Sequence, residues 1–208
     1  YYLAGKVKAV VRDAGGNNAG HTVINEKGTF QLHLIPSGIC WPGVYGIVGN
    51  GVVANPDVML DELTQLESRG IDVSNVYVSE RAHVIMPYHI VQDALEEKAR
   101  GSSAIGTTGQ GVGPAYVDKV SRGGVRFGDL LELEALSEKL KSTIQFKNKV
   151  FTQVYEGDGV SFDDVVKRCR EWAEWIRPHV RSTDQLIHDL LDDGNDVLLE
   201  GAQGTMLD

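Results

Sequence analysis

A run of glycine, asparagine and histidine follows the first apolar segment of the chain. Val7–Val11 is typical of a buried strand, and positions 15–22 then read Gly-Gly-Asn-Asn-Ala-Gly-His-Thr. Amides in glycine turns can approach an anion closely because no Cβ intervenes. Asn17 and Asn18 can fix a phosphate or a planar heterocycle by hydrogen bonds, and His21 is suited to proton donation near neutral pH. The alternative is a hairpin turn followed by a buried histidine, and these residues alone leave both open.

A second loop of this kind spans residues 102–119. Glycines alternate there with Thr107 and Thr108, and the loop runs into Pro114 at an expected helix start. Hydroxyl groups and exposed amides beside a helix N-terminus can cradle an anion. The Gly-Lys-Ser/Thr ending of a P-loop is missing. The alternative is a flexible surface loop.

Two further segments have residue types that bind nucleotides. Lys119, Arg122 and Arg126 lie within eight residues with no acid between them. On a helix, Lys119 and Arg122 would share a face and hold a phosphate, although a solvated face is the alternative. Gln203 follows the predicted strand Val197–Leu199, and its amide can both donate to and accept from a purine edge. An ordinary turn explains Gln203 equally well.

The composition excludes several classes of protein. The net charge is −9, nearly all of it within residues 129–208, so no overall basic field favours nucleic acid. No apolar run is long enough to span a membrane, and the first residues lack the layout of a signal peptide. We expect a cytoplasmic protein in which Cys40 and Cys169 are reduced packing residues, with a disulfide as the alternative. The other histidines, which show no metal spacing, are expected in packing or surface positions: His33, His83, His89, His179 and His188.

Strand-like and helix-like segments alternate along the chain, which predicts an α/β fold with a mainly parallel, mixed central sheet and flanking helices. Ligand loops of such sheets lie at the carboxyl edge of the strands. Residues 129–195 are predicted as a helix-rich excursion within a single domain over 1–208. The sequence starts like the end of a helix and stops in a glycine turn, so we expect a part of a longer protein. The expected strands are Val7–Val11, Phe30–Leu34, Val44–Val48, Asn75–Val78, His83–Met86 and Val197–Leu199, and the expected helices cover residues 54–70, 89–101, 130–149, 161–176 and 182–191.

Six segments together resemble one enzyme family. In chain order they are GGNNAGHT, LIPSGI, GNGVV, GTTGQGVGPAYVDKV, GVRFGDLL and LLEGAQGTMLD. This sequence is similar to the adenylosuccinate synthetases from about Val7 to Asp208. The resemblance implies a fold related to the P-loop NTPases, and a ligase that joins IMP to L-aspartate with GTP hydrolysis in AMP synthesis. It also implies 6-phosphoryl-IMP as the intermediate, Mg²⁺ as the cofactor and a cytoplasmic homodimer that uses no membrane or nucleic acid.

The resemblance also assigns roles to individual residues. His21 matches the catalytic histidine, which acts on the 6-oxygen of IMP, and Gly20 matches the glycine whose carbonyl coordinates Mg²⁺. The residues matched to GTP contacts are Gly20, His21 and Thr22. Arg122 matches an arginine that reaches the partner subunit's IMP. The residues matched to IMP contacts are Asn18, Ala19, Gly20, His21, Thr108, Arg122 and Gln203.

The family pattern extends beyond this sequence. It places a Gly-Asp-Glu-Gly-Lys-Gly-Lys phosphate loop and a catalytic aspartate upstream of Tyr1, and guanine and aspartate recognition downstream of Asp208. Gln110 stands where many members have arginine. Two alternatives remain open: a viral relative that acts on a deoxyguanylate acceptor, and a non-catalytic nucleotide-binding paralogue.

Overall fold

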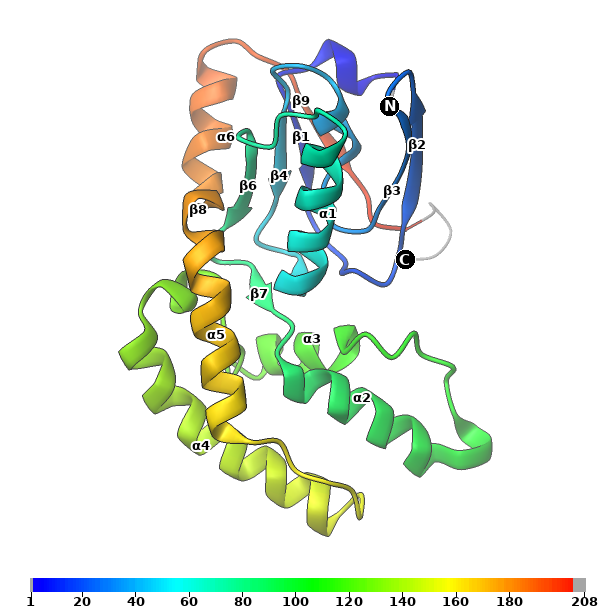
Figure 1. The fold of residues 1–208 in the computed structure, drawn as a ribbon, viewed down its shortest axis with the longest axis vertical. Coiled ribbons are helices and arrows are strands. Elements are labelled where there is room, and N and C mark those ends of the chain that lie inside the picture. The colour runs from blue at the N-terminus through cyan, green and yellow to red at the C-terminus, as the bar shows by residue number, and fades with distance from the viewer. Residues whose placement is uncertain (1, 204–208) are drawn as a thin grey trace.

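The computed structural model describes residues 2–203, and a five-stranded parallel sheet forms the centre of the fold (Figure 1). Its strand order is β8-β6-β4-β1-β9. The strands of the molecule are β1 (Ala9–Arg12), β2 (His21–Asn25), β3 (Gly28–Leu32), β4 (Tyr45–Val48), β5 (Val53–Ala54), β6 (Val76–Ser79), β7 (His83–Val84), β8 (Val180–Arg181) and β9 (Val197–Glu200). The helices are α1 (Pro56–Ser68), α2 (Pro87–Arg100), α3 (Val112–Val120), α4 (Leu133–Gln153), α5 (Phe162–Ile176) and α6 (Thr183–Asp192). The predicted fold class is confirmed.

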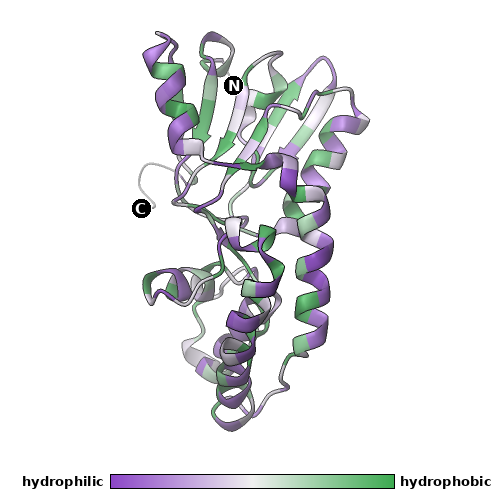
Figure 2. Ribbon diagram, turned by 90° about the vertical axis from the view of Figure 1, so that its left-hand side faces the viewer, coloured by the Kyte–Doolittle hydropathy of each residue, from purple (hydrophilic) through white to green (hydrophobic). Residues whose placement is uncertain are grey.

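Alternation of side chains along the strands places different helices on the two faces of the sheet. Val11 and Ile47 pack with Leu186 and Leu190 of α6 on one face. On the other face, Val48, Val76 and Val78 share a core with Met59, Leu63 and Leu66 of α1. Figure 2 shows hydrophobic residues concentrated in the strands, whereas the helices alternate hydrophobic and hydrophilic positions. The apolar stripes of α1 and α6 therefore face the sheet.

All pairings described in the central sheet are parallel, so the prediction of a mixed sheet is wrong. The antiparallel pair is a separate hairpin of β2 and β3, with Asn25 opposite Gly28. The sequence prediction missed β2 because Val23 is its only fully buried residue. The predicted strand Phe30–Leu34 is shifted, since β3 ends at Leu32.

Helices α2, α3 and α4 lie below the sheet in Figure 1, and α5 runs back toward it. Asp57 of α1 accepts hydrogen bonds from Trp172 Nε1 at 2.7 Å and Arg168 Nη2 at 2.7 Å, which fixes α5 against α1. The predicted strand His83–Met86 is short: β7 ends at Val84 and pairs with β5 rather than with the central sheet. No helix within residues 2–203 is both long enough and apolar enough to cross a membrane.

The buried carboxylate of Glu62 on α1 shapes the turn after β3. It accepts backbone hydrogen bonds from His33 at 2.6 Å, Leu34 at 3.2 Å and Ile35 at 2.9 Å. Burial raises the pKa of Glu62, and these three amides oppose the rise. The carboxylate thus takes the place of the strand partners that this turn lacks.

Substituting Glu62 should destabilise the fold strongly. Glu62→Leu leaves three amides without an acceptor, so we expect the free energy of unfolding to fall by about 3 kcal/mol. Glu67→Leu removes the same charge from an exposed position of α1 and should change it by less than about 0.5 kcal/mol. Urea denaturation of both variants measures the difference. Equal losses would contradict this role of Glu62.

Candidate functional site

The loops after β1 and β9 meet at the carboxyl edge of the sheet, because Arg12 and Glu200 lie opposite each other in neighbouring parallel strands. Gly15 has a φ of 84°, and a Cβ on it would lie 2.3 Å from the Cβ of Ala202. Only glycine allows the two loops to approach this closely. The loop over 13–20 is therefore packed against Ala202 and is not a simple hairpin turn. The hairpin of this region lies further along, between β2 and β3.

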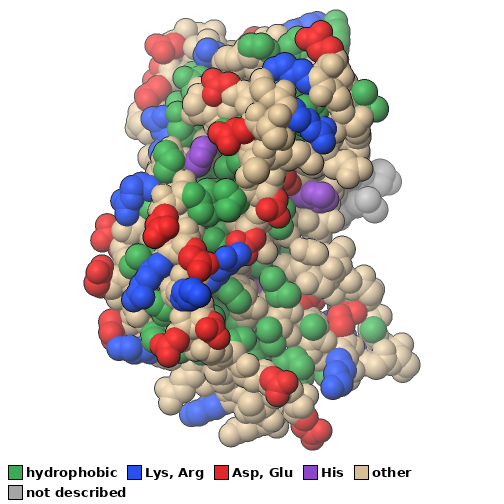
Figure 3. Space-filling view, in the orientation of Figure 1, with side chains coloured by type: hydrophobic (Ala, Val, Ile, Leu, Met, Phe, Trp, Pro, Cys, Tyr) green, Lys and Arg blue, Asp and Glu red, His purple; other side chains and the backbone are tan. Residues whose placement is uncertain are grey.

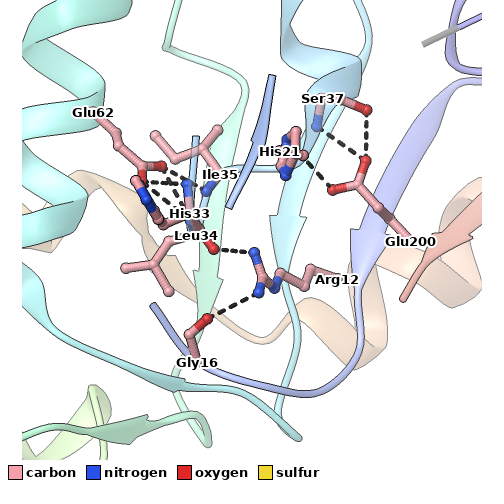
Figure 4. A network of polar contacts seen from close by, with 9 residues as sticks. All are labelled: Arg12, Gly16, His21, His33, Leu34, Ile35, Ser37, Glu62 and Glu200. Carbon is pink, nitrogen blue, oxygen red and sulfur yellow. Dashed lines mark hydrogen bonds and ion pairs between the residues drawn. The ribbon is translucent and has the colours of Figure 1, made fainter. Parts of the chain in front are cut away.

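A fully buried arginine, Arg12, is hydrogen-bonded to the loop (Figure 4). Arg12 donates from Nη2 to the Gly16 carbonyl at 2.9 Å and from Nη1 to the His33 carbonyl. The Tyr116 hydroxyl accepts from the Gly15 amide at 2.9 Å and lies within hydrogen-bond distance of the Gly15 and Gly51 carbonyls. Sequence reasoning missed both residues, since nothing in their local pattern distinguishes them from ordinary core positions.

His21 is the first residue of β2, at the end of this loop. Its Nε2 lies 3.9 Å from Glu200 Oε1 and has no hydrogen-bond partner in the described part of the chain. Glu200 Oε2 accepts from the hydroxyl of Ser37 at 2.5 Å and from its amide at 3.1 Å (Figure 4). Burial lowers the pKa of His21, and the Glu200 carboxylate partly opposes this. His21 thus lines a pocket, and its buried Nε2 makes no hydrogen bond within the described residues.

The pocket beside His21 has a volume of about 260 Å³. Its lining joins the start of β2 to the end of β9. The lining residues are Gly20, His21, Thr22, Val23, Ser37, Glu200, Gly201 and Ala202. Asn18 and Gln203 are exposed nearby in sequence, and Ala19 is half-buried. Six of the residues predicted for the site therefore lie on these two adjacent loops.

The threonine loop also contacts the first loop at Gln110, whose Oε1 accepts a hydrogen bond from Asn17 Nδ2 at 3.0 Å. Thr108 is exposed and leads toward the N-terminus of α3. The amides of residues 105–107 and 111 donate to carboxylates on α2, so only part of the loop has amides available to an anion. Within residues 2–203, the amides of residues 108–110 have no acceptor.

The basic run forms a second, separate pocket of about 230 Å³. Helix α3 ends at Val120, and Arg122 follows it with a φ of 68°, so Lys119 and Arg122 do not share a helical face as predicted. The turn nevertheless brings both to one pocket. The guanidinium groups of Arg122 and Arg126 pair with no group in the described residues. The lining residues are His83, Lys119, Arg122, Gly124, Arg126, Asp129 and Lys139.

His83 makes this pocket sensitive to acid. Burial, and then Lys119, Arg126 and Lys139, lower the pKa of His83 to about 4, against a weaker opposite effect of Asp129. An unfolded chain takes up a proton on this histidine below about pH 6.5, whereas the folded chain does not. The stability contributed by neutral His83 is therefore present above pH 6.5 and is lost as the pH falls toward 4.

His83→Gln should reduce the acid sensitivity of the fold. Between pH 7 and pH 4.5, its free energy of unfolding should fall by about 2 kcal/mol less than that of the wild type. His188 is exposed on α6, and His188→Gln should keep the wild-type slope. Denaturant titrations across this pH range test the prediction, which is wrong if both variants follow the same curve.

The fold and site define a class of protein: an α/β protein whose glycine-rich loops lie together at the carboxyl edge of a parallel sheet, where such proteins bind ligands. Charged side chains of both signs are interspersed over the face seen in Figure 3. The family model of adenylosuccinate synthetase matches residues 1–208. This chain belongs to the adenylosuccinate synthetase family.

Individual relatives agree with this membership. The adenylosuccinate synthetase of Dehalococcoides mccartyi is 49% identical over 206 residues, covering 99% of this chain and 49% of that protein. That of Limosilactobacillus fermentum is 48% identical over 207 residues, covering 100% of this chain and 48% of that protein. The chain thus spans about half the length of the curated relatives it matches.

Solved structures support the fold. The fully ligated adenylosuccinate synthetase of Plasmodium falciparum matches with a TM-score of 0.86 and 27% identity, over 99% of this chain and 48% of that one. The succinoaminodeoxyadenylate synthetase of cyanophage S-2L, bound to dGMP and dATP, matches with a TM-score of 0.52 and 22% identity, over 96% and 45% of the two chains. At that identity the second likeness shows the fold alone.

Proposed function

We propose that this chain is part of a cytoplasmic enzyme that joins IMP to L-aspartate with hydrolysis of GTP, in the synthesis of AMP. The 6-oxygen of IMP is first phosphorylated, and the aspartate amine then displaces phosphate. One observation carries the proposal beyond family membership: the predicted ligand loops converge. Asn17 of the first loop hydrogen-bonds Gln110 of the second, and Gly15 packs on Ala202 of the third.

His21 is the general acid in this proposal. Charge develops on the 6-oxygen of IMP and on the transferring phosphoryl group, so a donor placed at that oxygen stabilises the transition state. Two observations support this role: His21 lines the pocket, and its Nε2 has no hydrogen-bond partner within the described residues. Gly20 and Thr22, on either side of it, contact GTP.

The phosphate of IMP binds at the threonine loop in this proposal. Thr108 supplies an exposed hydroxyl, and the unpaired amides of residues 108–110 precede the N-terminus of α3, whose dipole favours an anion. Asn18 and Ala19 contact the nucleotide from the first loop. Gln203 holds it from the third.

The residues fit Mg²⁺ as an ion that arrives with GTP. Mg²⁺ keeps several waters and usually takes only one or two protein oxygens beside substrate phosphates. Gly20 is exposed at the pocket, and its carbonyl is one such oxygen. Residues 2–203 contain no cluster of three histidine, cysteine or carboxylate side chains suited to a metal. When bound, the ion would neutralise charge on the transferring phosphoryl group.

Arg122 serves the partner subunit of a homodimer in this proposal. Its left-handed backbone turns it out of α3, and its guanidinium is exposed and unpaired in the described residues. The pocket that Arg122 lines has no residue in common with the His21 pocket of the same chain. A planar guanidinium suits bidentate binding of the partner's IMP phosphate.

The 208-residue chain alone should bind IMP weakly and should not turn over, because it spans about half the length of its relatives. The full-length protein that carries it should make adenylosuccinate from IMP, aspartate and GTP. A spectrophotometric assay of both proteins and calorimetric titration with IMP make the comparison. Turnover by the chain alone would contradict the proposal that part of the active site lies outside these 208 residues. A full-length protein without this activity would contradict the proposed function.

A further inference from the structure

Two carboxylates on α2 hold the threonine loop by five hydrogen bonds. Glu97 accepts from the amides of Ile105 at 3.2 Å, Gly106 at 2.8 Å and Thr107 at 3.3 Å. Asp93, one helical turn earlier, accepts from the Thr107 hydroxyl at 2.8 Å and from the Gly111 amide at 2.9 Å. The loop is thus attached to α2 on both sides of Thr108.

Few other contacts hold this loop in place. Residues 101–109 are exposed, and nothing lies within 4 Å of a Cβ built on Gly106 or Gly109. Both glycines have positive φ, at 78° and 67°, so the free chain has many alternatives to this conformation. Without the two carboxylates, residues 105–110 would retain only the Asn17–Gln110 hydrogen bond to the rest of the described chain.

The carboxylates bind one set of amides and leave another set free. The amides on either side of the loop tip point to Asp93 and Glu97. Those of residues 108–110, at the tip, have no acceptor within the described residues, and the Thr108 hydroxyl is also unpaired. The contacts with α2 therefore fix the base of the loop while its tip stays available to an anion.

We propose that Asp93 and Glu97 are positioning residues, which set the conformation of the threonine loop before a nucleotide phosphate binds. The inference rests on the proposed function, in which Thr108 binds the phosphate of IMP. Ordering a flexible glycine loop costs conformational entropy for each residue that is fixed. A loop already fixed by α2 does not incur that cost when the ligand binds, so its affinity is higher.

The same contacts have an opposite interpretation that experiment can separate. Three amides converging on one carboxylate also describe an anion site, with Glu97 occupying it in place of a phosphate. In that case Glu97 would compete with the ligand, and its removal would tighten binding. The free amides at the loop tip favour positioning over competition, because a phosphate has donors there without displacing Glu97.

Glu97→Ala in the full-length protein should weaken IMP binding by about tenfold or more, measured by titration calorimetry, and leave the Kd for GTP unchanged. Glu97→Gln keeps an acceptor oxygen and should recover part of the loss. Glu96→Ala is the matched control: it removes the same charge one residue away, where the carboxylate contacts Gln92 and Arg100 rather than the loop. It should bind IMP like the wild type.

A second readout needs no ligand. Amide hydrogen exchange in a peptide covering residues 104–111 should be faster in Glu97→Ala than in the wild type and unchanged in Glu96→Ala. Unaltered exchange, or IMP binding that is unchanged or tighter in Glu97→Ala, would overturn the positioning role. A wild-type protein that does not bind IMP at all would instead contradict the proposed function, and the exchange rates would still test whether Glu97 fixes the loop.

Discussion

His21→Asn should lower kcat by about 10²–10⁴-fold, the range typical of a lost general acid, and should change the KM for IMP far less. In the proposed mechanism, the imidazole acts on the 6-oxygen mainly when charge develops there, whereas the loops on either side bind the nucleotide in the ground state as well. The measurement is the steady-state rate of the full-length protein over a range of IMP concentrations. Asparagine also carries an N–H donor and has a similar size, so its side chain should occupy the space beside Glu200 that the His21 ring fills.

His188→Asn is the matched control for this substitution. His188 is exposed on α6 and outside the lining of the His21 pocket, so its replacement should leave kcat within about threefold of the wild type. A His21→Asn protein that keeps wild-type kcat, or one that loses only affinity for IMP, would remove His21 from the chemical step.

Arg122→Leu should raise the KM for IMP by about 10–100-fold and leave GTP binding largely intact. The loss corresponds to one charge-assisted hydrogen-bonding group on a phosphate. Arg170 is exposed on α5 and outside both pockets, and Arg170→Leu should have no such effect. If the affinity for GTP fell equally, the assignment of Arg122 to the partner's IMP would be wrong.

Mixing the two impaired variants, at an IMP concentration below the raised KM, tests which subunit uses Arg122. Consider a dimer of one Arg122→Leu subunit and one His21→Asn subunit. If each site takes Arg122 from the partner, one of the two sites contains both wild-type His21 and wild-type Arg122. Activity should therefore reappear after the subunits are mixed and exchanged. No recovery would indicate that Arg122 acts within its own chain.

The sequence was sufficient to predict the general position of the site but not its internal contacts. The glycines at 15–16 and the strand before the first loop follow from local pattern, and the structure brings that loop to the sheet edge as predicted. Glu200 is different. Its approach to His21 depends on the pairing of β1 with β9, which joins distant parts of the chain. No local pattern reports such a pairing.

The hydrogen bonds from α2 to the threonine loop could not be predicted from the sequence either. Asp93 and Glu97 are spaced like solvent-exposed helix acids, yet the structure directs them to a loop that follows the helix. The end of α3 had a local signal that the prediction did not use. Gly123 and Gly124 both donate to the Asp118 carbonyl, and this glycine pair marks a helix end before Arg122.

The choice of nucleotide acceptor tests the central claim most directly. The full-length protein carrying this chain should be assayed with aspartate and either IMP with GTP or dGMP with dATP, by detecting the succinylated product of each. We predict product from IMP and GTP, with dependence on aspartate, and none from dGMP. Turnover of dGMP without turnover of IMP would show that the three loops form the site of a different acceptor.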